Sequence, residues 1–145
     1  MIRSKIINVF MLVSFILCVT SCDSTKHEIT LVATNYAESF YNYDYKTAVQ
    51  FVTNESKHVI VFYSSNVSQS DLDQYNRSKK IKVKIEDVKL NDESNEATVT
   101  VKISNMLRIS LLNKHDTTIK EKEIHLDLKL IDGKWLVDLT SNKWS

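Results

Sequence analysis

Two carboxylates near the C-terminal end are the residues of this sequence best suited to acid–base or metal chemistry. The turn predicted at residues 132–133 would place Asp127 directly opposite Asp138 on paired strands. His125 and Lys129 would flank the pair. Two close carboxylates can share a proton, and a histidine beside them could complete a metal site. Their predicted position is the solvent face, where Lys129 and water would screen the repulsion, so we interpret the pair as surface charge.

The remaining histidines do not indicate a metal site or a catalytic pair. They are scattered along the chain without the spacing of metal ligands: His27, His58 and His115. No nucleophilic side chain has a histidine partner in a recognisable sequence motif. We therefore predict no catalytic residue, no metal and no cofactor, and hence no enzymatic activity.

Cys22 has the clearest predicted chemistry, which is the covalent attachment of lipid. Two basic residues precede an almost uninterrupted apolar run over residues 6–19, and residues 19–22 are Val-Thr-Ser-Cys. This segment resembles a bacterial lipoprotein signal with its lipobox, in which small residues before a cysteine permit cleavage. The resemblance implies that residues 1–21 are a signal peptide. It also implies that the sulfur of Cys22 carries a diacylglyceryl group.

Acylation would place the mature protein in the cell envelope, on the inner or the outer membrane, with residues 22–28 as a polar, lipidated tether. Each buried methylene contributes about 0.8 kcal/mol, so two or three long acyl chains, such as palmitate, would hold the protein on a bilayer almost permanently. An uncleaved transmembrane anchor is the alternative. The apolar run is shorter than the ~18 to 20 residues that a spanning helix needs, and its C-terminal flank is not basic.

The composition of the mature chain limits what it can bind. The signal would remove two of the 19 basic residues and none of the 18 acidic ones, which leaves a nearly neutral protein. We therefore predict no nucleic-acid binding, because that function needs a strongly basic face. Residues 29–145 suit a single domain. Loss of Cys18 with the signal and acylation of Cys22 would leave no cysteine pair for a disulfide.

The first half of the mature chain has the apolar spacing of helices. Residues 29–40 carry apolar side chains at every third or fourth position, which predicts a helix with one buried stripe. Asp44 is suited to cap a second short helix. Residues 59–63 favour strands by residue type, so the nature of this element stays open. Ser70, with an aspartate three residues later, predicts a capping box that begins a helix over residues 72–78.

The second half alternates apolar and polar residues with the period of strands. Residues 81–90 change their apolar phase near residues 86–87, which predicts a bulge that bends the strand. A second strand is predicted over residues 97–111 and a third over residues 124–130. The two-residue turn then fixes the register of a terminal hairpin. The predicted pairs are Leu130 with Trp135, Leu128 with Val137, and Leu126 with Leu139.

Helices followed by a bent antiparallel meander predict an α+β domain in which the helical stripe packs on the concave face of the sheet. The pattern resembles the nuclear transport factor 2-like, cystatin-like cone that ketosteroid isomerases and polyketide cyclases share. The resemblance rests on the aromatic corner at residues 41–45 and the Asp-Gly-Lys-Trp-Leu-Val hairpin at residues 132–137, and small envelope lipoproteins of unknown function have similar hairpins. The isomerases use a buried carboxylate base. The inward positions predicted on the last two strands cannot transfer a proton: Leu126, Leu128, Leu130, Trp135, Val137 and Leu139.

Two kinds of binding remain open for such a domain. A hollow cone could hold a small apolar ligand, with ordinary core packing as the alternative; the predicted lining is Tyr36, Phe40, Tyr41, Phe51, Phe62 and Trp135. A protein partner or a second copy could instead dock on the outer face of the sheet. That face is predicted to carry Lys82, Lys84, Thr98, Thr100, Lys102, His125, Asp127 and Asp138, with Met106 and Leu112 as apolar exceptions. We predict a membrane-anchored lipoprotein with a non-catalytic binding or interaction domain. A small apolar-ligand binder or a ketosteroid-isomerase-like enzyme is the alternative.

Overall fold

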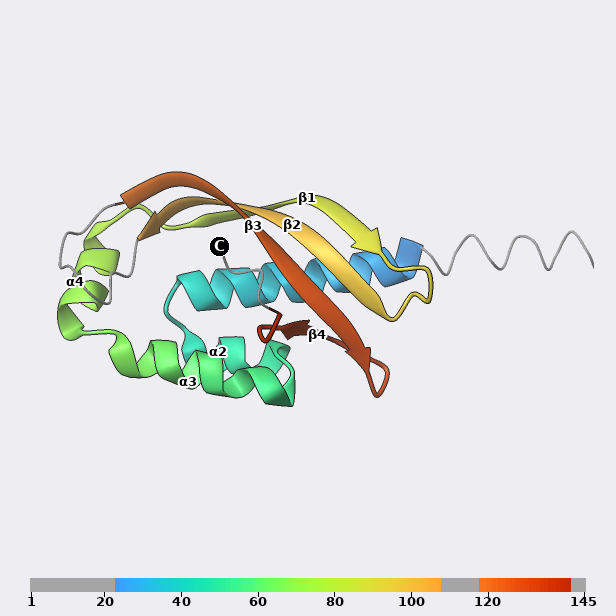
Figure 1. Cartoon of the computed structure of the whole chain (residues 1–145). Coiled ribbons are helices and arrows are strands. Elements are labelled where there is room, and N and C mark those ends of the chain that lie inside the picture. Colours follow the sequence, from blue (N-terminus) through green and yellow to red (C-terminus); the bar gives the residue numbers. More distant parts are fainter. Residues whose placement is uncertain (1–22, 108–117, 142–145) are drawn as a thin grey trace, which may run out of the picture.

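A long N-terminal helix and a curved sheet are the two main parts of the fold. The computed structural model of the protein describes residues 23–107 and 118–141. The N-terminal helix lies against the concave face of a four-stranded antiparallel sheet, in which the strands follow the order β1-β2-β3-β4 (Figure 1). This arrangement confirms the predicted α+β architecture. The signal segment and Cys22 lie outside the described residues.

The N-terminal helix covers residues 23–41 and buries the apolar stripe that the sequence predicts. The buried apolar members of this stripe are Ile29, Ala33, Tyr36, Ala37 and Phe40. Residues 23–28, which were predicted to form a tether ahead of the domain, belong to the same helix and are mostly exposed. The helix is therefore already formed at residue 23. No helix within the two described stretches is long and apolar enough to cross a bilayer.

Three short elements follow this helix. Asp44 caps α2 (Tyr45–Ala48) as predicted, because its Oδ1 accepts a hydrogen bond from the backbone N–H of Thr47 at 3.1 Å. The 3-10 helices η1 (Val49–Phe51) and η2 (Asn54–Ser56) come next. Val52, which lies between them, forms a bridge to Val137, so this segment runs beside the edge of the sheet before the next α-helix.

The segment rich in strand-favouring residues forms a helix, α3 (Lys57–Asn66). Ile60 is buried and Tyr63 packs against the core, whereas Val61 and Phe62 are exposed. Contacts at a spacing of three residues suit a helix, and tertiary packing here outweighs the modest strand propensity of β-branched side chains. The open choice between helix and strand is thereby settled as helix.

The capping box that starts α4 (Gln69–Arg77) lies two residues earlier than predicted. Ser68 donates its backbone N–H to Asp71 Oδ2 at 2.7 Å, and Ser68 Oγ accepts the backbone N–H of Asp71 at 3.2 Å. The prediction used Ser70 and Asp73 instead. Two overlapping Ser-x-x-Asp patterns occur here, and local sequence alone does not distinguish them.

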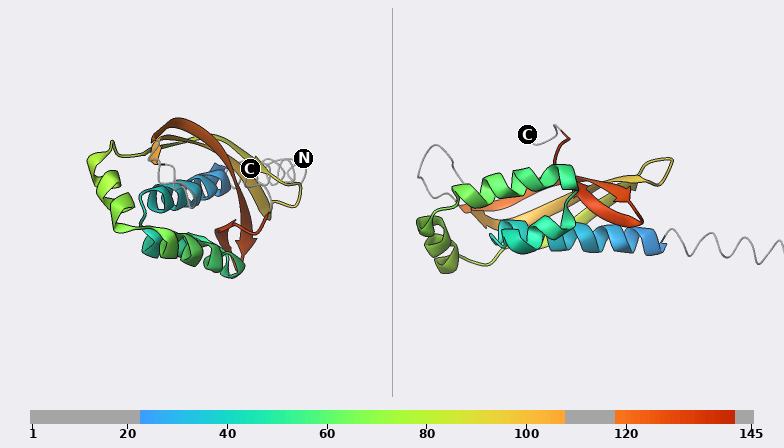
Figure 2. Two further views of the ribbon diagram at one scale, coloured as in Figure 1. Left: turned by 60° about the vertical axis from the view of Figure 1, so that its left-hand side comes forward. Right: turned by 90° about the horizontal axis from the view of Figure 1, so that it is seen from below.

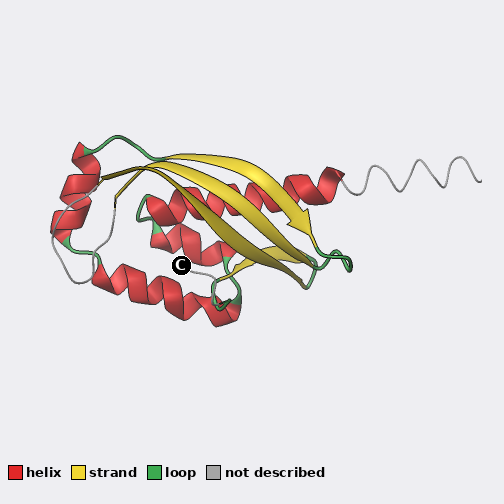
Figure 3. Ribbon diagram, turned by 45° about the horizontal axis from the view of Figure 1, so that its top comes forward, coloured by secondary structure: helices red, strands yellow, loops and turns green. Residues whose placement is uncertain are grey.

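Four strands form the sheet: β1 (Lys82–Leu90), β2 (Glu96–Leu107), β3 (Thr118–Ile131) and β4 (Lys134–Asp138). The register between β1 and β2 shifts between Ile85 and Asp87, which confirms the predicted bulge. The long strands curve over the N-terminal helix (Figure 3). The predicted continuation of the second strand over residues 109–111 lies outside the described residues.

The hairpin between β3 and β4 has the predicted two-residue turn. Asp132 and Gly133 both have positive φ, 49° and 75°, as a type I′ turn requires. The confirmed pairs are Leu130 with Trp135, Leu128 with Val137, and Asp127 with Asp138. Leu139 is buried but follows the end of β4, so its predicted ladder pair with Leu126 does not form. Leu130 is 39% exposed despite its inward position, because it lies close to the turn.

Met106 is buried, although the sequence predicts it on the outer face. The reason is a local change in backbone conformation at Asn105, whose φ is 62°. A left-handed residue interrupts the regular alternation of a strand, so the side chain that follows changes face. Upstream of this point the predicted inner row is correct. Its buried members on β2 are Ala97, Val99, Val101 and Ile103.

Candidate functional site

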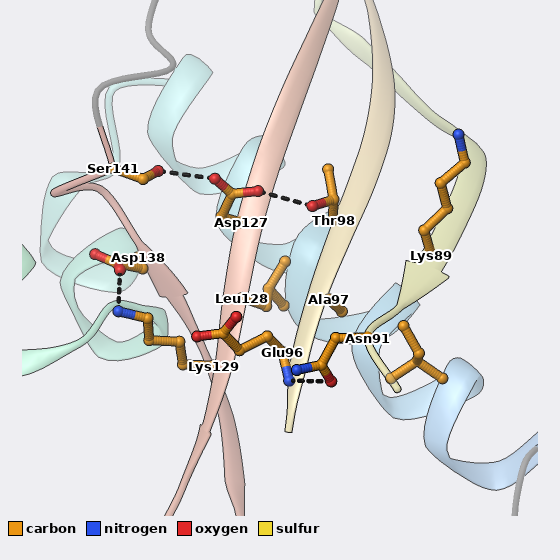
Figure 4. Close-up of a pocket in the computed structure, with 11 residues that line it drawn as sticks. Lys89, Asn91, Glu96, Ala97, Thr98, Asp127, Leu128, Lys129, Asp138 and Ser141 are labelled. Carbon is orange, nitrogen blue, oxygen red and sulfur yellow. Dashed lines mark hydrogen bonds and ion pairs between the residues drawn. The ribbon is translucent and has the colours of Figure 1, made fainter. Parts of the chain in front are cut away.

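A row of polar residues crosses all four strands on the outer face of the sheet. Lys89 pairs with Thr98, Thr98 with Asp127, and Asp127 with Asp138. The row borders a concavity of about 440 Å³ (Figure 4), and the N-terminal helix lies behind the strands in this view. The strand register therefore brings one lysine, one hydroxyl and two carboxylates to the lining of one hollow.

Asp127 is held by hydroxyl groups on both sides. Its Oδ1 accepts a hydrogen bond from Thr98 Oγ1, and its Oδ2 accepts one from Ser141 Oγ, each at 2.8 Å. Thr98 belongs to the neighbouring strand, whereas Ser141 comes from the segment after β4. The side chain is half-buried and its orientation is fixed by two different parts of the chain.

Asp138 is buried with 5% exposure, which corrects its predicted position on the solvent face. Its Oδ2 lies 2.7 Å from Lys129 Nζ, and its Oδ1 accepts the backbone N–H and the hydroxyl of Thr140 at 2.9 and 2.6 Å. The Ser56 hydroxyl also donates to Oδ1, at 3.4 Å, from the end of η2. Strand alternation places Asp138 on the outer face, but the chain before α3 and the chain after β4 cover it.

The charged and hydroxyl neighbours of Asp138 determine its protonation. Burial alone would raise the pKa of this carboxyl, but the hydrogen bonds from Lys129 and Thr140 outweigh burial and lower the pKa to about 2. The hydrogen bond to Asp138 in turn raises the pKa of the Lys129 ammonium. Asp138 is therefore ionised at neutral pH and forms an ion pair.

The two carboxylates are engaged by groups on several parts of the chain. Each of their four oxygens has a hydrogen-bond or ion-pair partner: Thr98 and Ser141 for Asp127, and Thr140 and Lys129 for Asp138. His125 contacts Thr100 Oγ1 at 3.2 Å and Glu123 at 3.9 Å. Within residues 23–107 and 118–141, no three histidine, cysteine or acidic side chains are grouped as metal ligands.

A second candidate site is a cluster of aromatic rings between the N-terminal helix and α3. Phe40 lies at its centre and stacks on Tyr36 with 5.5 Å between ring centroids. Three further rings meet Phe40 edge-on at 5.1 to 5.4 Å: Tyr41, Tyr45 and Tyr63. Such contacts add to the stability of a core, and tyrosine hydroxyls can also offer polar points to a ligand.

Two hydroxyl groups in this aromatic cluster have no hydrogen-bond partner among the described residues, those of Tyr36 and Tyr45. Tyr36 is fully buried, and burial followed by the nearby tyrosines raises its pKa well above the ordinary value. Burial likewise raises the pKa of Tyr41 and Tyr45. These phenols stay neutral, and two of them lack the partner that buried polar groups normally have.

The structure brings together only part of the predicted pocket lining. Tyr36, Phe40 and Tyr41 meet in the aromatic cluster, and Trp135 is buried in the core on β4. Phe62 is 52% exposed on α3, so it does not line the interior. Phe51 borders a different hollow of about 450 Å³, beside the C-terminal half of the N-terminal helix: its other lining residues are Asn35, Glu38, Ser39, Asn42, Asp44 and Thr47.

The sequence prediction missed Tyr45 and Tyr63 as members of the aromatic cluster. Tyr45 follows the cap residue of α2 within the aromatic corner, so its proximity to Phe40 could have been predicted. Tyr63 could be placed only after the segment around it had been identified as a helix. Because the sequence left open whether this segment is a helix or a strand, Tyr63 could not be included in the predicted aromatic lining.

Comparisons with known proteins add little beyond the fold. No family model matches the sequence, and no curated protein matches it. A proposed nuclear transport factor 2-like transpeptidase from Campylobacter jejuni has 20% identity and a TM-score of 0.48, over 74% of this chain and 94% of that one. A proposed dehydratase of the nuclear transport factor 2-like family from Streptomyces avermitilis has 15% identity and a TM-score of 0.41, over 79% and 92%. A proposed polyketide cyclase from Xanthomonas campestris has 12% identity and a TM-score of 0.38, over 83% of this chain and 96% of that one. These similarities are too low to carry an argument about function.

Proposed function

We propose that this protein is a lipid-anchored component of the bacterial cell envelope whose domain binds a partner protein through the outer face of its sheet. The observation that carries the proposal is the fixed row of polar groups beside the outer concavity. Asp127 is held by Thr98 and Ser141, and the half-exposed Lys129 is held by the buried Asp138, so little freedom is lost when a partner contacts Asp127 and Lys129. Preorganised polar groups are typical of specific recognition surfaces.

The lining of the concavity supports a protein partner. Lys89 and Glu96 contribute charged groups, and the half-buried Leu90 adds apolar surface. A mixture of apolar area and oriented polar groups is the composition of most non-obligate protein interfaces. The hollow is also open to solvent and not enclosed, which suits a protruding side chain or loop of a partner better than a buried small molecule.

The distribution of ionisable groups supports binding in preference to proton transfer. Among the described residues, Asp138 is the only buried residue of the acidic, basic and histidine types, and it is engaged by Lys129 and Thr140. Proton abstraction inside the cone would need a base that faces the interior. The inner row of the sheet is apolar instead.

Photocrosslinking in the native host tests the partner surface. A photoreactive phenylalanine analogue at Lys89, whose side chain is 79% exposed, should give a discrete protein adduct. The same analogue at Asn76, an exposed residue on α4, is the matched control and should not give that adduct. Identical adducts at both positions, or none at Lys89 in envelope fractions that contain the protein, would contradict the proposed surface.

The membrane anchor has a separate test at Cys22. Metabolic labelling with palmitate should mark the protein, and Cys22→Ser should remove both the label and the stable association with membranes. A label that is absent from the wild-type protein would contradict acylation. That result would not bear on the partner surface of the sheet, which the photocrosslinking experiment tests separately.

A second candidate function is binding of a small, mostly apolar ligand within the aromatic cluster. The unpartnered hydroxyls of Tyr36 and Tyr45 favour it, because a ligand acceptor could satisfy them. Native mass spectrometry of the protein purified from its own host should then detect a bound small molecule. Tyr36→Phe should release that molecule. A wild-type protein without any adduct would contradict this function.

A further inference from the structure

Three segments lie at one end of the molecule: the start of the N-terminal helix, the β1–β2 turn and the tip of the β3–β4 hairpin. Figure 1 and the right view of Figure 2 show the blue start of this helix, the yellow β1–β2 turn and the red β3–β4 turn toward the same end. A hydrogen bond from Leu130 N–H to the carbonyl of Asn95 at 2.8 Å joins the turn to the hairpin. α4 lies at the opposite end (Figure 1).

The position of Cys22 in the sequence makes this end the one nearest to the lipid. Cys22 directly precedes residue 23, where the structure is already helical. A helix advances only about 1.5 Å per residue, so residues 23–28 supply little reach compared with an extended tether. Whatever lies level with the first turn of the helix therefore lies close to the membrane surface, provided that Cys22 is acylated.

The hairpin tip presents apolar side chains at this same end. Leu130 is 39% exposed and Ile131 is 37% exposed, and both precede the turn directly. The turn is tight, because Asp132 and Gly133 adopt the paired positive φ angles of a two-residue hairpin. A narrow tip with two exposed apolar side chains suits shallow insertion into the interface of a bilayer.

The charges nearby indicate the kind of lipid that this end would tolerate. Asp92 and Glu93 are exposed in the β1–β2 turn, and Lys134 is exposed beside the hairpin turn. The acidic turn disfavours a strongly anionic surface. The chemistry at this end therefore fits zwitterionic phospholipid.

We propose that Leu130 and Ile131 form a second membrane contact, which holds the domain end-on against a zwitterionic bilayer. This inference rests on the proposed acylation of Cys22. The contact is too small to bind a membrane alone, but an acyl anchor on the residue that directly precedes the helix would give the tip a high effective concentration at the surface. The domain would then have one preferred orientation, with α4 directed away from the bilayer.

Site-specific fluorescence tests the contact in the full-length, acylated protein. The sequence has two cysteines, Cys18 in the signal and Cys22 at the lipid site, so an added cysteine would carry the only free thiol. A fluorophore is attached at Lys134→Cys beside the tip, or at Asn76→Cys on α4 as the matched control. The protein is reconstituted in phosphatidylcholine vesicles that contain nitroxide-labelled phosphatidylcholine.

We expect loss of fluorescence at position 134 and none at position 76. Replacing both tip residues, Leu130→Ser with Ile131→Ser, should restore fluorescence at position 134 while the protein stays on the vesicles. Equal quenching at positions 134 and 76, or quenching at 134 that the double substitution does not change, would overturn the tip contact. Mass spectrometry separates this result from a failure of the anchor, because a protein without acyl chains on Cys22 contradicts the proposed acylation itself.

Discussion

Replacement of Asp138 by asparagine should reveal how much the outer network contributes to stability. Asp138→Asn preserves the size of the side chain and removes the charge that pairs with Lys129. The pKa falls from an ordinary 3.8 to about 2 in the folded protein, and at 1.36 kcal/mol per pKa unit this corresponds to about 2 kcal/mol of folding free energy. Asp138 is only 5% exposed, so solvent screening reduces this figure little. Lys129 stays half-exposed and can be hydrated, which keeps the loss below that of an isolated buried charge.

The dependence on pH distinguishes this mechanism from a general packing defect. The folded pKa lies below the unfolded one, so the contribution is complete above about pH 5 and is lost as the pH falls through the folded pKa. We expect a deficit in the free energy of unfolding of about 2 kcal/mol at pH 7 and about 1 kcal/mol at pH 3. The assay is urea denaturation of wild type and variant at several pH values, with a common m-value.

A second substitution provides the control for this experiment. Asp87 forms an ion pair with Lys89 at 3.5 Å, with side chains 51% and 79% exposed. Asp87→Asn should change the free energy of unfolding by less than about 0.5 kcal/mol, because exposed ion pairs contribute little. A deficit for Asp138→Asn that stays constant from pH 7 to pH 3, or that is no larger than the Asp87 effect, would refute the proposed role of the network.

Three further substitutions have distinct expected outcomes. Tyr36→Phe should raise the stability of the ligand-free protein by about 1 kcal/mol, since it removes a buried hydroxyl without a partner; Tyr75→Phe should lower it, because Tyr75 donates a hydrogen bond to Asn42. Thermal unfolding of both variants checks this pair, and a loss of stability for Tyr36→Phe would show that its hydroxyl is satisfied in solution. Gly133→Ala should cost about 1 kcal/mol because φ is +75°, although no atom lies within 4 Å of the added carbon. An unchanged melting temperature would argue against a strained turn at Gly133.

The terminal hairpin could be predicted in detail because its determinants are local. A two-residue Asp-Gly turn admits few backbone conformations, so the pairing of Asp127 with Asp138 followed from counting outward from the turn. The burial of Asp138 could not be predicted in the same way. Its cover includes Ser56, which is 82 positions away in the sequence. Strand alternation determines the face of a side chain, but the segments that later cover that face are a tertiary property.

Two other differences have backbone and packing causes. Met106 changed face because Asn105 adopts a left-handed conformation, and asparagine is one of the few residues that tolerate it. In α3, the run of β-branched and aromatic residues has the composition of a strand. The helix was hard to predict from this run because the apolar Val61 and Phe62 are exposed beside the buried Ile60, so the apolar pattern does not follow one helical face. Residue type favoured a strand there, and the available partner surface decided for a helix.

The β1 edge of the sheet and its short edge strand β4 both have features that resist the addition of another strand. β1 is the outermost strand on one side, where Lys82, Lys84 and Lys89 are exposed and a bulge interrupts the regular ladder. On the other side Val52 bridges to Val137, and the backbone N–H of residue 53 donates to the Val137 carbonyl at 3.0 Å. Sheets avoid edge-to-edge aggregation by such features, which include exposed lysines, bulges in the edge strand and segments that cover the edge. Copies of the domain that come close together would therefore add strands poorly at β1 and at β4.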